Sequence, residues 1–93
     1  MIDIKNKSFK ISDDTVISKM GDHAVLLNLK SGAYFELNEV ALFIAENLKN
    51  LATVDKIKSI VIEKFDVEEQ ECEDDVKLFL KQLIERDLLE LEV

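Results

Sequence analysis

The sequence lacks most of the residues from which small proteins build special sites. Its 93 residues include no proline, no tryptophan, two glycines, one cysteine and one histidine. One cysteine excludes an internal disulfide and a cysteine-based zinc site. No apolar stretch in Met1–Lys10 could act as a signal peptide, and the longest apolar run, Val40–Ala45, is far below the ~20 residues that span a bilayer. We expect one cytoplasmic domain over residues 1–93, with no cofactor, metal or membrane partner.

Basic side chains are also scarce. The chain has 12 of them against 20 acidic side chains, a formal charge of −8. Residues 38–93 hold the whole excess, with seven basic and fifteen acidic side chains. Because Lys and Arg supply most of the affinity for phosphate backbones, this balance argues against a nucleic acid as partner.

The first part of the chain has the pattern of β-strands. β-prone and alternating apolar side chains predict strands at Thr15–Met20, His23–Leu29 and Ala33–Leu37. Turn residues between these segments indicate that the strands are joined as an antiparallel meander. Gly32 can supply the positive φ that a short hairpin link needs. A further strand piece near Phe9–Ser12 is also indicated.

The second part of the chain has helical periodicity. A first helix follows the cap residue Asn38 and ends near Lys49–Asn50, a second follows the cap Thr53, and a third begins at residues 68–69. Leu88–Val93 alternates weakly and is either an extended tail or a last strand. Together these elements predict an α+β fold with three strands before three helices. The expected apolar stripes are Val40, Phe43, Ile44 and Leu48; Val54, Ile57, Val61 and Phe65; and Cys72, Val76, Phe79, Leu80 and Leu83.

Three patterns in the sequence partly match chemical sites, and each of them lacks a required feature. The acidic run Asp66–Asp75 lacks the central glycine and the alternating ligands of a calcium loop, so a solvated helix start explains it better. His23 and Cys72 could serve as the base and the nucleophile of a catalytic pair, but they lie on different elements. Cys72 also falls on an apolar stripe, where a buried thiol is expected. Ser59 lies inside a helix, whereas an acyl carrier protein needs Asp-Ser-Leu at a helix start. We therefore predict that the chain is not an enzyme.

The architecture itself offers a binding surface. The strand Ala33–Leu37 is the last of the meander and lies at the edge of the sheet, where unpaired N–H and C=O groups can accept a further strand. Leu78 lies outside the core stripe of the third helix, beside Asp75 and Gln82, and is a candidate contact residue. The alternative is that Leu78 is an ordinary exposed leucine.

The segment Leu29–Glu39 has the order of a strand, a short glycine turn, an aromatic pair and then Leu-Asn. This pattern resembles that of the PqqD-like family. The similarity continues through the second helix to Phe65-Asp66-Val67 and into Asp75–Leu83, and it covers about residues 14–90. One departure is Asp87, where the family often has glycine.

The resemblance implies a recognition element for ribosomally made, post-translationally modified peptides. Such domains look like winged helix-turn-helix folds. They bind the leader segment of a precursor peptide as an added strand on the third strand, in a groove walled by the third helix. They then present the core segment to a partner such as a radical-SAM enzyme or the leader peptidase and cyclase of lasso-peptide systems. Carried onto this sequence, the binding residues are Ala33, Tyr34, Phe35, Glu36, Leu37, Asp75, Leu78, Phe79 and Gln82.

Two other functions were compared with peptide binding. The winged-helix likeness raises DNA binding, but residues 68–75 carry six acidic side chains and no basic one, which would repel phosphates. The rival hypothesis is a small regulatory or interaction subunit that uses the same edge strand to form a homodimer. For Tyr34, packing on a guest strand and simply covering the open face of the sheet are both consistent with the sequence.

Overall fold

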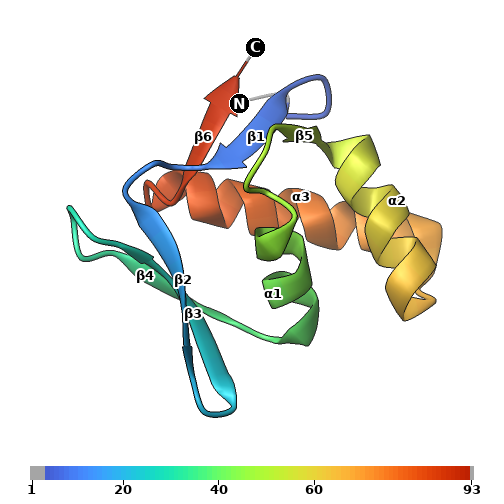
Figure 1. Ribbon diagram of the computed structural model, residues 1–93. Helices are drawn as coiled ribbons and strands as arrows, with labels where there is room; N and C mark the ends of the chain where they lie inside the picture. The colour runs from blue at the N-terminus through green and yellow to red at the C-terminus, as the bar shows by residue number, and fades with distance from the viewer. Residues whose placement is uncertain (1–3, 93) are drawn as a thin grey trace.

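The computed structural model describes residues 4–92, which form an α+β fold of two three-stranded antiparallel sheets and three helices (Figure 1). One sheet has the strand order β2-β3-β4 and is the predicted meander; the other has the order β5-β1-β6. The predicted class, a three-stranded meander followed by three helices, is confirmed. In chain order the elements are β1 (Ser8–Ile11), β2 (Thr15–Met20), β3 (His23–Asn28), β4 (Tyr34–Leu37), α1 (Glu39–Glu46), β5 (Ala52–Thr53), α2 (Val54–Phe65), α3 (Glu69–Glu85) and β6 (Leu89–Glu92).

The meander buries one face. Ala24, Leu26 and Leu37 are buried, and Ala24 lies opposite Leu37 in the β3–β4 register. Two boundaries differ from the prediction by one residue, since β3 ends at Asn28 and β4 begins at Tyr34.

Asn28 explains where β3 ends. Its Oδ1 accepts hydrogen bonds from the backbone N–H groups of Lys30 and Ser31, at 2.9 and 3.0 Å, which turns the chain into the hairpin. Gly32 then has a φ of 80°, as expected for a glycine in this link. The Nδ2 of Asn28 donates to the Asp87 carbonyl at 2.9 Å, so the same buried side chain also fastens the hairpin to the segment after α3.

The second sheet joins the two segments that the sequence left uncertain. Phe9 of β1 lies opposite Leu91 of β6 and also opposite Ala52 of the two-residue strand β5, which was not predicted. Phe9 is fully buried. The possible tail at Leu88–Val93 is therefore a strand over its described residues, and residue 93 itself lies outside them.

The helices begin where the caps predict. Asn38 Oδ1 accepts from the Ala41 N–H at 2.8 Å, and Thr53 Oγ1 accepts from the Lys56 N–H at 3.2 Å. The expected end of the first helix near Lys49–Asn50 is wrong, because α1 stops at Glu46. Asn47 caps it by donating its Nδ2 to the Phe43 carbonyl at 2.8 Å. None of the helices in residues 4–92 is long and apolar enough to cross a membrane.

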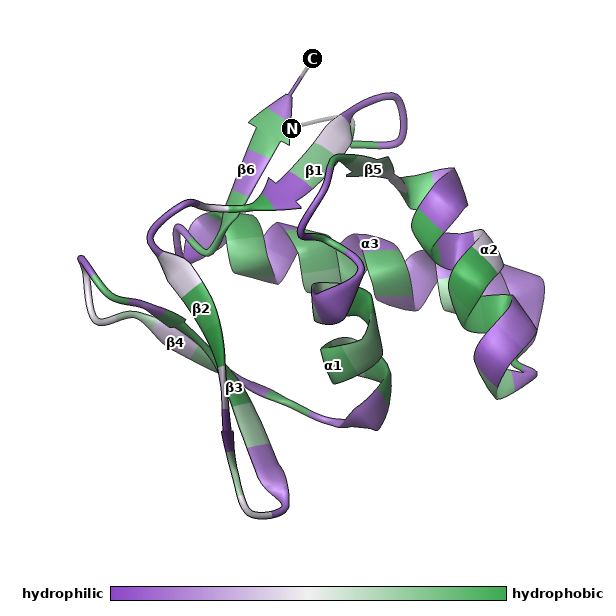
Figure 2. Ribbon diagram, in the orientation of Figure 1, coloured by the Kyte–Doolittle hydropathy of each residue, from purple (hydrophilic) through white to green (hydrophobic). Residues whose placement is uncertain are grey.

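The core lies between the sheets and the helices. In Figure 2 the short helix α1 is hydrophobic almost throughout, whereas α2 and α3 alternate between hydrophobic and hydrophilic positions. That difference fits their places, since α1 contacts β3, β4 and α2, and α2 packs on α3.

Cys72 is buried as predicted, and burial raises the pKa of its thiol, with the nearby Asp75 carboxylate adding to the effect. A protonated thiol is a poor nucleophile.

Glu73 ties three parts of the chain together. Its carboxylate lies 3.0 Å from the Nζ of Lys5, 3.0 Å from that of Lys58 and 3.1 Å from that of Lys77. The hydrogen bonds from these three lysines lower the pKa of Glu73 to about 2, and the bond to Glu73 raises the pKa of Lys58. This acidic residue of α3 therefore has a structural role that joins the N-terminal segment, α2 and α3.

Candidate functional site

The outer edge of β4 carries backbone groups that no neighbouring strand uses. The Asn28 N–H donates to the Ala33 carbonyl at 2.8 Å, so Ala33 points toward β3. Because the direction of backbone groups alternates along a strand, Phe35 and Leu37 also bond to β3, whereas Tyr34 and Glu36 point away from it. Within residues 4–92 no further strand pairs with this side of β4.

Helix α3 lies beside this edge. The rings of Phe35 in β4 and Phe79 in α3 meet edge to face with centroids 5.6 Å apart. Arg86, directly after α3, donates from Nη1 to the Tyr34 carbonyl at 3.0 Å, and its Cζ lies 5.0 Å from the centroid of the Phe35 ring. The end of α3 thus lies near the start of β4, and the two elements run in opposite directions.

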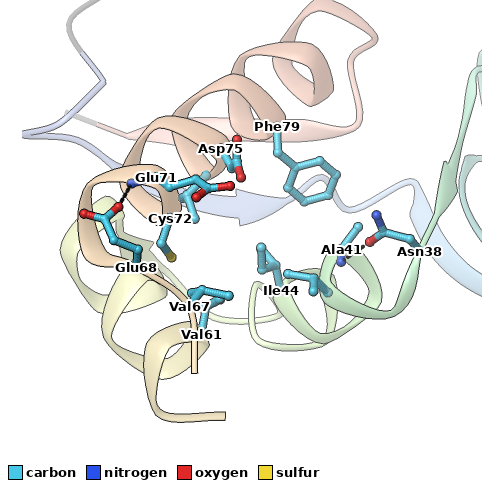
Figure 3. Close-up of a pocket in the computed structure, with 12 residues that line it drawn as sticks. Asn38, Ala41, Ile44, Val61, Val67, Glu68, Glu71, Cys72, Asp75 and Phe79 are labelled. Atoms are coloured by element: carbon cyan, nitrogen blue, oxygen red, sulfur yellow. Dashed lines mark hydrogen bonds between the residues drawn. The ribbon is translucent and has the colours of Figure 1, made fainter. Parts of the chain in front are cut away.

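A pocket of about 400 Å³ opens where β4 ends. It lies between α1, the end of α2 and the first half of α3, and Figure 3 shows Phe79 and Asp75 across it from Asn38, Ala41 and Ile44. This volume falls within the roughly 300–1,000 Å³ of ligand pockets in proteins. The lining residues are Asn38, Val40, Ala41, Ile44, Val61, Val67, Glu68, Glu71, Cys72, Asp75, Val76 and Phe79.

The pocket combines an apolar lining with acidic groups. Glu68, Glu71 and Asp75 supply three carboxylates, and no lysine or arginine is among the lining residues. Glu68 accepts from the Glu71 N–H at 2.6 Å and so caps α3, as the dashed line in Figure 3 marks. An apolar side chain with a neighbouring positive charge would suit this pocket.

The structure distributes the predicted binding residues over three places. Tyr34 and Glu36 lie along the outer edge of β4 and are exposed on the face that points away from the core, whereas Ala33 precedes the strand and its carbonyl bonds to Asn28. Phe35 is half-buried against Phe79, and Leu37 is buried in the core. On α3, Asp75 and Phe79 line the pocket, whereas Leu78 and Gln82 are exposed and outside it.

Sequence reasoning missed two groups of residues at this site. One is Arg86, whose contact with Tyr34 joins positions 52 apart in the chain. The other is the α1 side of the pocket, chiefly Ala41 and Ile44, of which the sequence predicts only Ile44, as a residue of the apolar stripe. The only sequence feature that points to Arg86 is that it is the single arginine of the chain.

Fold and site together define a class: a small α+β domain that leaves one strand edge open beside a helix and a pocket. The family described as "Coenzyme PQQ synthesis protein D (PqqD)" matches residues 23–89. The chain belongs to this family, which confirms the resemblance seen in the sequence.

Two solved structures share the fold. "TbiB1 in Complex with the TbiA(beta) Leader Peptide" is 33% identical, with a TM-score of 0.76, and the match covers 87% of this chain and 94% of that one. "Lasso peptide synthetase B1 complexed with the leader peptide" is 22% identical, with a TM-score of 0.75 and coverage of 88% and 96%. A search of curated proteins finds no match to this chain.

Proposed function

We propose that this protein binds the leader segment of a ribosomally made precursor peptide and presents the peptide to a modifying or processing enzyme. Membership of the PqqD family supports the proposal, as does the similarity to TbiB1, which was solved with a leader peptide. The observation that carries it is the open edge of β4 next to α3. The protein acts as a recognition subunit and not as an enzyme.

The bound segment adds to β4 as a further strand. Tyr34 and Glu36 carry two outward N–H and two outward C=O groups, of which the Tyr34 carbonyl accepts from Arg86 in the free protein, and each net hydrogen bond contributes about 0.5–1.5 kcal/mol. Main-chain bonds of this kind give affinity without much dependence on the peptide sequence.

Side chains beside the edge supply selectivity. The pocket takes an apolar side chain of the leader, and Glu71 and Asp75 at its rim favour a lysine or arginine next to it. Leu78 and Gln82 extend the contact surface along α3. Tyr34, which is 61% exposed, packs against a guest side chain on the outer face of the sheet, a cross-strand contact of about 0.2–1 kcal/mol.

The partner enzyme belongs to one of two classes. A radical-SAM enzyme would modify the core segment, and a lasso-peptide leader peptidase and cyclase would process it. Both need the core segment to remain free while the leader is held, which strand addition at one edge permits.

The rival function is self-association through the same edge. An open strand edge pairs readily with a copy of itself, and the exposed apolar side chains of Val16 and Met20 lie on the same sheet. Size measurement with and without peptide separates the two functions. A dimer that a leader peptide leaves intact would favour the rival.

Isothermal titration tests the proposal directly. The titrant is the leader segment of a short precursor peptide encoded beside the gene, and the control is the same leader in scrambled order. We expect saturable one-to-one binding of the leader only. Absence of heat and of any thermal shift with the leader would contradict the proposal.

A further inference from the structure

The start of the β4 edge is occupied by Arg86. The guanidinium donates to the Tyr34 carbonyl at 3.0 Å and lies over the Phe35 ring, 5.0 Å from its centroid. Arg86 itself is exposed and forms the C-cap of α3, so only its side chain reaches the strand. A charged side chain laid over an edge is one of the ways in which proteins prevent unwanted strand pairing.

The contact matters because the edge is short. Among the four residues of β4 only Tyr34 and Glu36 point outward, so the edge has two carbonyl acceptors and Arg86 occupies one of them. A strand that pairs along the whole edge brings an N–H donor of its own to the Tyr34 carbonyl and competes with the guanidinium for it. The displaced group stays nearby, because its backbone is fixed at the end of α3 and the Phe35 ring attracts it. It then needs a new acceptor for its donors.

We propose that Arg86 is a specificity-determining residue: it caps the Tyr34 carbonyl in the free protein, and the bound peptide displaces it and gives it a carboxylate. This inference rests on the proposed function. A guanidinium matches a carboxylate with two parallel hydrogen bonds, which a lone backbone carbonyl cannot offer.

The inference specifies the charge order of the bound peptide. Arg86 marks the Tyr34 end of β4, whereas Glu68, Glu71 and Asp75 lie at the Asn38 end. Four residues separate these ends, roughly 13 Å at about 3.3 Å per residue. The preferred peptide is therefore an extended segment with Asp or Glu at one end of the paired region and Lys or Arg at the other. This order also fixes the direction in which the peptide lies.

Selection from a display library of random peptides tests the charge order. We expect the wild-type protein to enrich peptides with a carboxylate and a basic residue about four positions apart, and Arg86→Glu to replace the carboxylate preference with a basic one. Lys81→Glu, which makes the same charge change at another exposed position of α3, is the matched control and should select like wild type. If wild type and Arg86→Glu enrich peptides with the same charge pattern, the inference is overturned and the proposed function still stands. If no peptide is enriched at all, both fail.

A binding cycle measures the contact itself. Changing the selected carboxylate of the peptide to its amide should weaken wild-type binding about two- to fivefold and should have no effect on Arg86→Gln. Equal losses for both proteins would overturn the inference.

The guanidinium can also be observed directly. Since Arg86 is the only arginine, its side-chain N–H resonances are unambiguous in a nitrogen-resolved NMR spectrum. They should shift when a selected peptide binds, and unchanged resonances at saturation would overturn the displacement step.

Discussion

Two acidic residues of α3, two positions apart, have opposite surroundings. Glu73 is held by three lysines and its side chain is only 12% exposed, whereas Asp75 is exposed at the rim of the pocket, where no lysine or arginine is among the lining residues. One carboxylate therefore stabilises the fold, and the other is available to a ligand. The acidic run 66–75 is therefore neither a uniform solvated surface nor a uniform binding wall.

The largest effect that separates these roles should come from Glu73→Gln. Loss of the charge leaves Lys58, whose side chain is 15% exposed, without its closest carboxylate. We expect the melting temperature to fall by several degrees, while the folded protein still binds peptide with unchanged affinity. Glu63→Gln, at an exposed position of α2, should change neither. Equal melting temperatures for the two variants would show that the cluster around Glu73 has no structural role.

Acid titration sharpens the same contrast. The pKa of Glu73 is about 2 in the folded protein against an ordinary value of 4.5, so its contribution to stability is complete above pH 4.5 and is lost as the pH falls toward 2. Urea unfolding measured across this range should show a steeper loss for wild type than for Glu73→Gln. If the free energies of unfolding of wild type and Glu73→Gln fall in parallel with pH, the Glu73 carboxylate does not stabilise the fold.

Leu78 tests the surface next to Asp75. Leu78 is 57% exposed, and we expect Leu78→Asp to weaken leader binding about fivefold or more without changing the melting temperature, because the new charge cannot pack against the peptide. Leu51→Asp alters a leucine that is 49% exposed outside the helices and is the control. If both variants bind like wild type, Leu78 does not contact the peptide.

Asp75→Asn should produce a smaller loss. Removing one rim charge should weaken binding of a basic leader about two- to fivefold, mostly by slowing association, with stability unchanged. The loss should shrink at high salt, since exposed charges are screened. A fall in melting temperature as large as that of Glu73→Gln would erase the distinction between the two carboxylates.

The smallest effect concerns the residue that fixes the end of α3. Asp87 has a φ of 58°, a conformation that glycine adopts without strain, and its carbonyl accepts the hydrogen bond from Asn28. Asp87→Gly should therefore raise the free energy of unfolding by a few tenths of a kcal/mol in denaturant titration, partly offset by the greater entropy of the unfolded glycine. A clear destabilisation would mean that the aspartate side chain has another role.

The sequence predicted the elements that depend on local pattern. Asn38, Thr53 and the apolar stripe through Cys72, Val76, Leu80 and Leu83 act at short range, so the helix starts and the buried face of α3 were predictable. The stripe expected for the first helix was only partly right, because α1 buries Ile44 and Ala45 while Val40 and Phe43 are half-buried. The strand ranges were also predictable from alternation, although alternation alone does not tell which face of a strand is buried.

Features that join distant segments were not predictable in this way. The pairing of Phe9 with Leu91, the bond from Arg86 to Tyr34 and the pocket between Ala41 and Phe79 each link positions far apart in the chain. Local periodicity carries no information about which distant partner a segment meets. The glycine that the family often has at the position of Asp87 was a useful hint, since the backbone there has a positive φ.

Amide hydrogen exchange with a bound leader peptide tests most directly whether β4 accepts a further strand. Tyr34 and Glu36 should exchange more slowly once the peptide is bound, while Phe35 and Leu37, already bonded to β3, should change little. Unchanged exchange at Tyr34 and Glu36 under saturating peptide, or protection at the outward residues Ile17 and Lys19 of β2 instead, would contradict strand addition at β4.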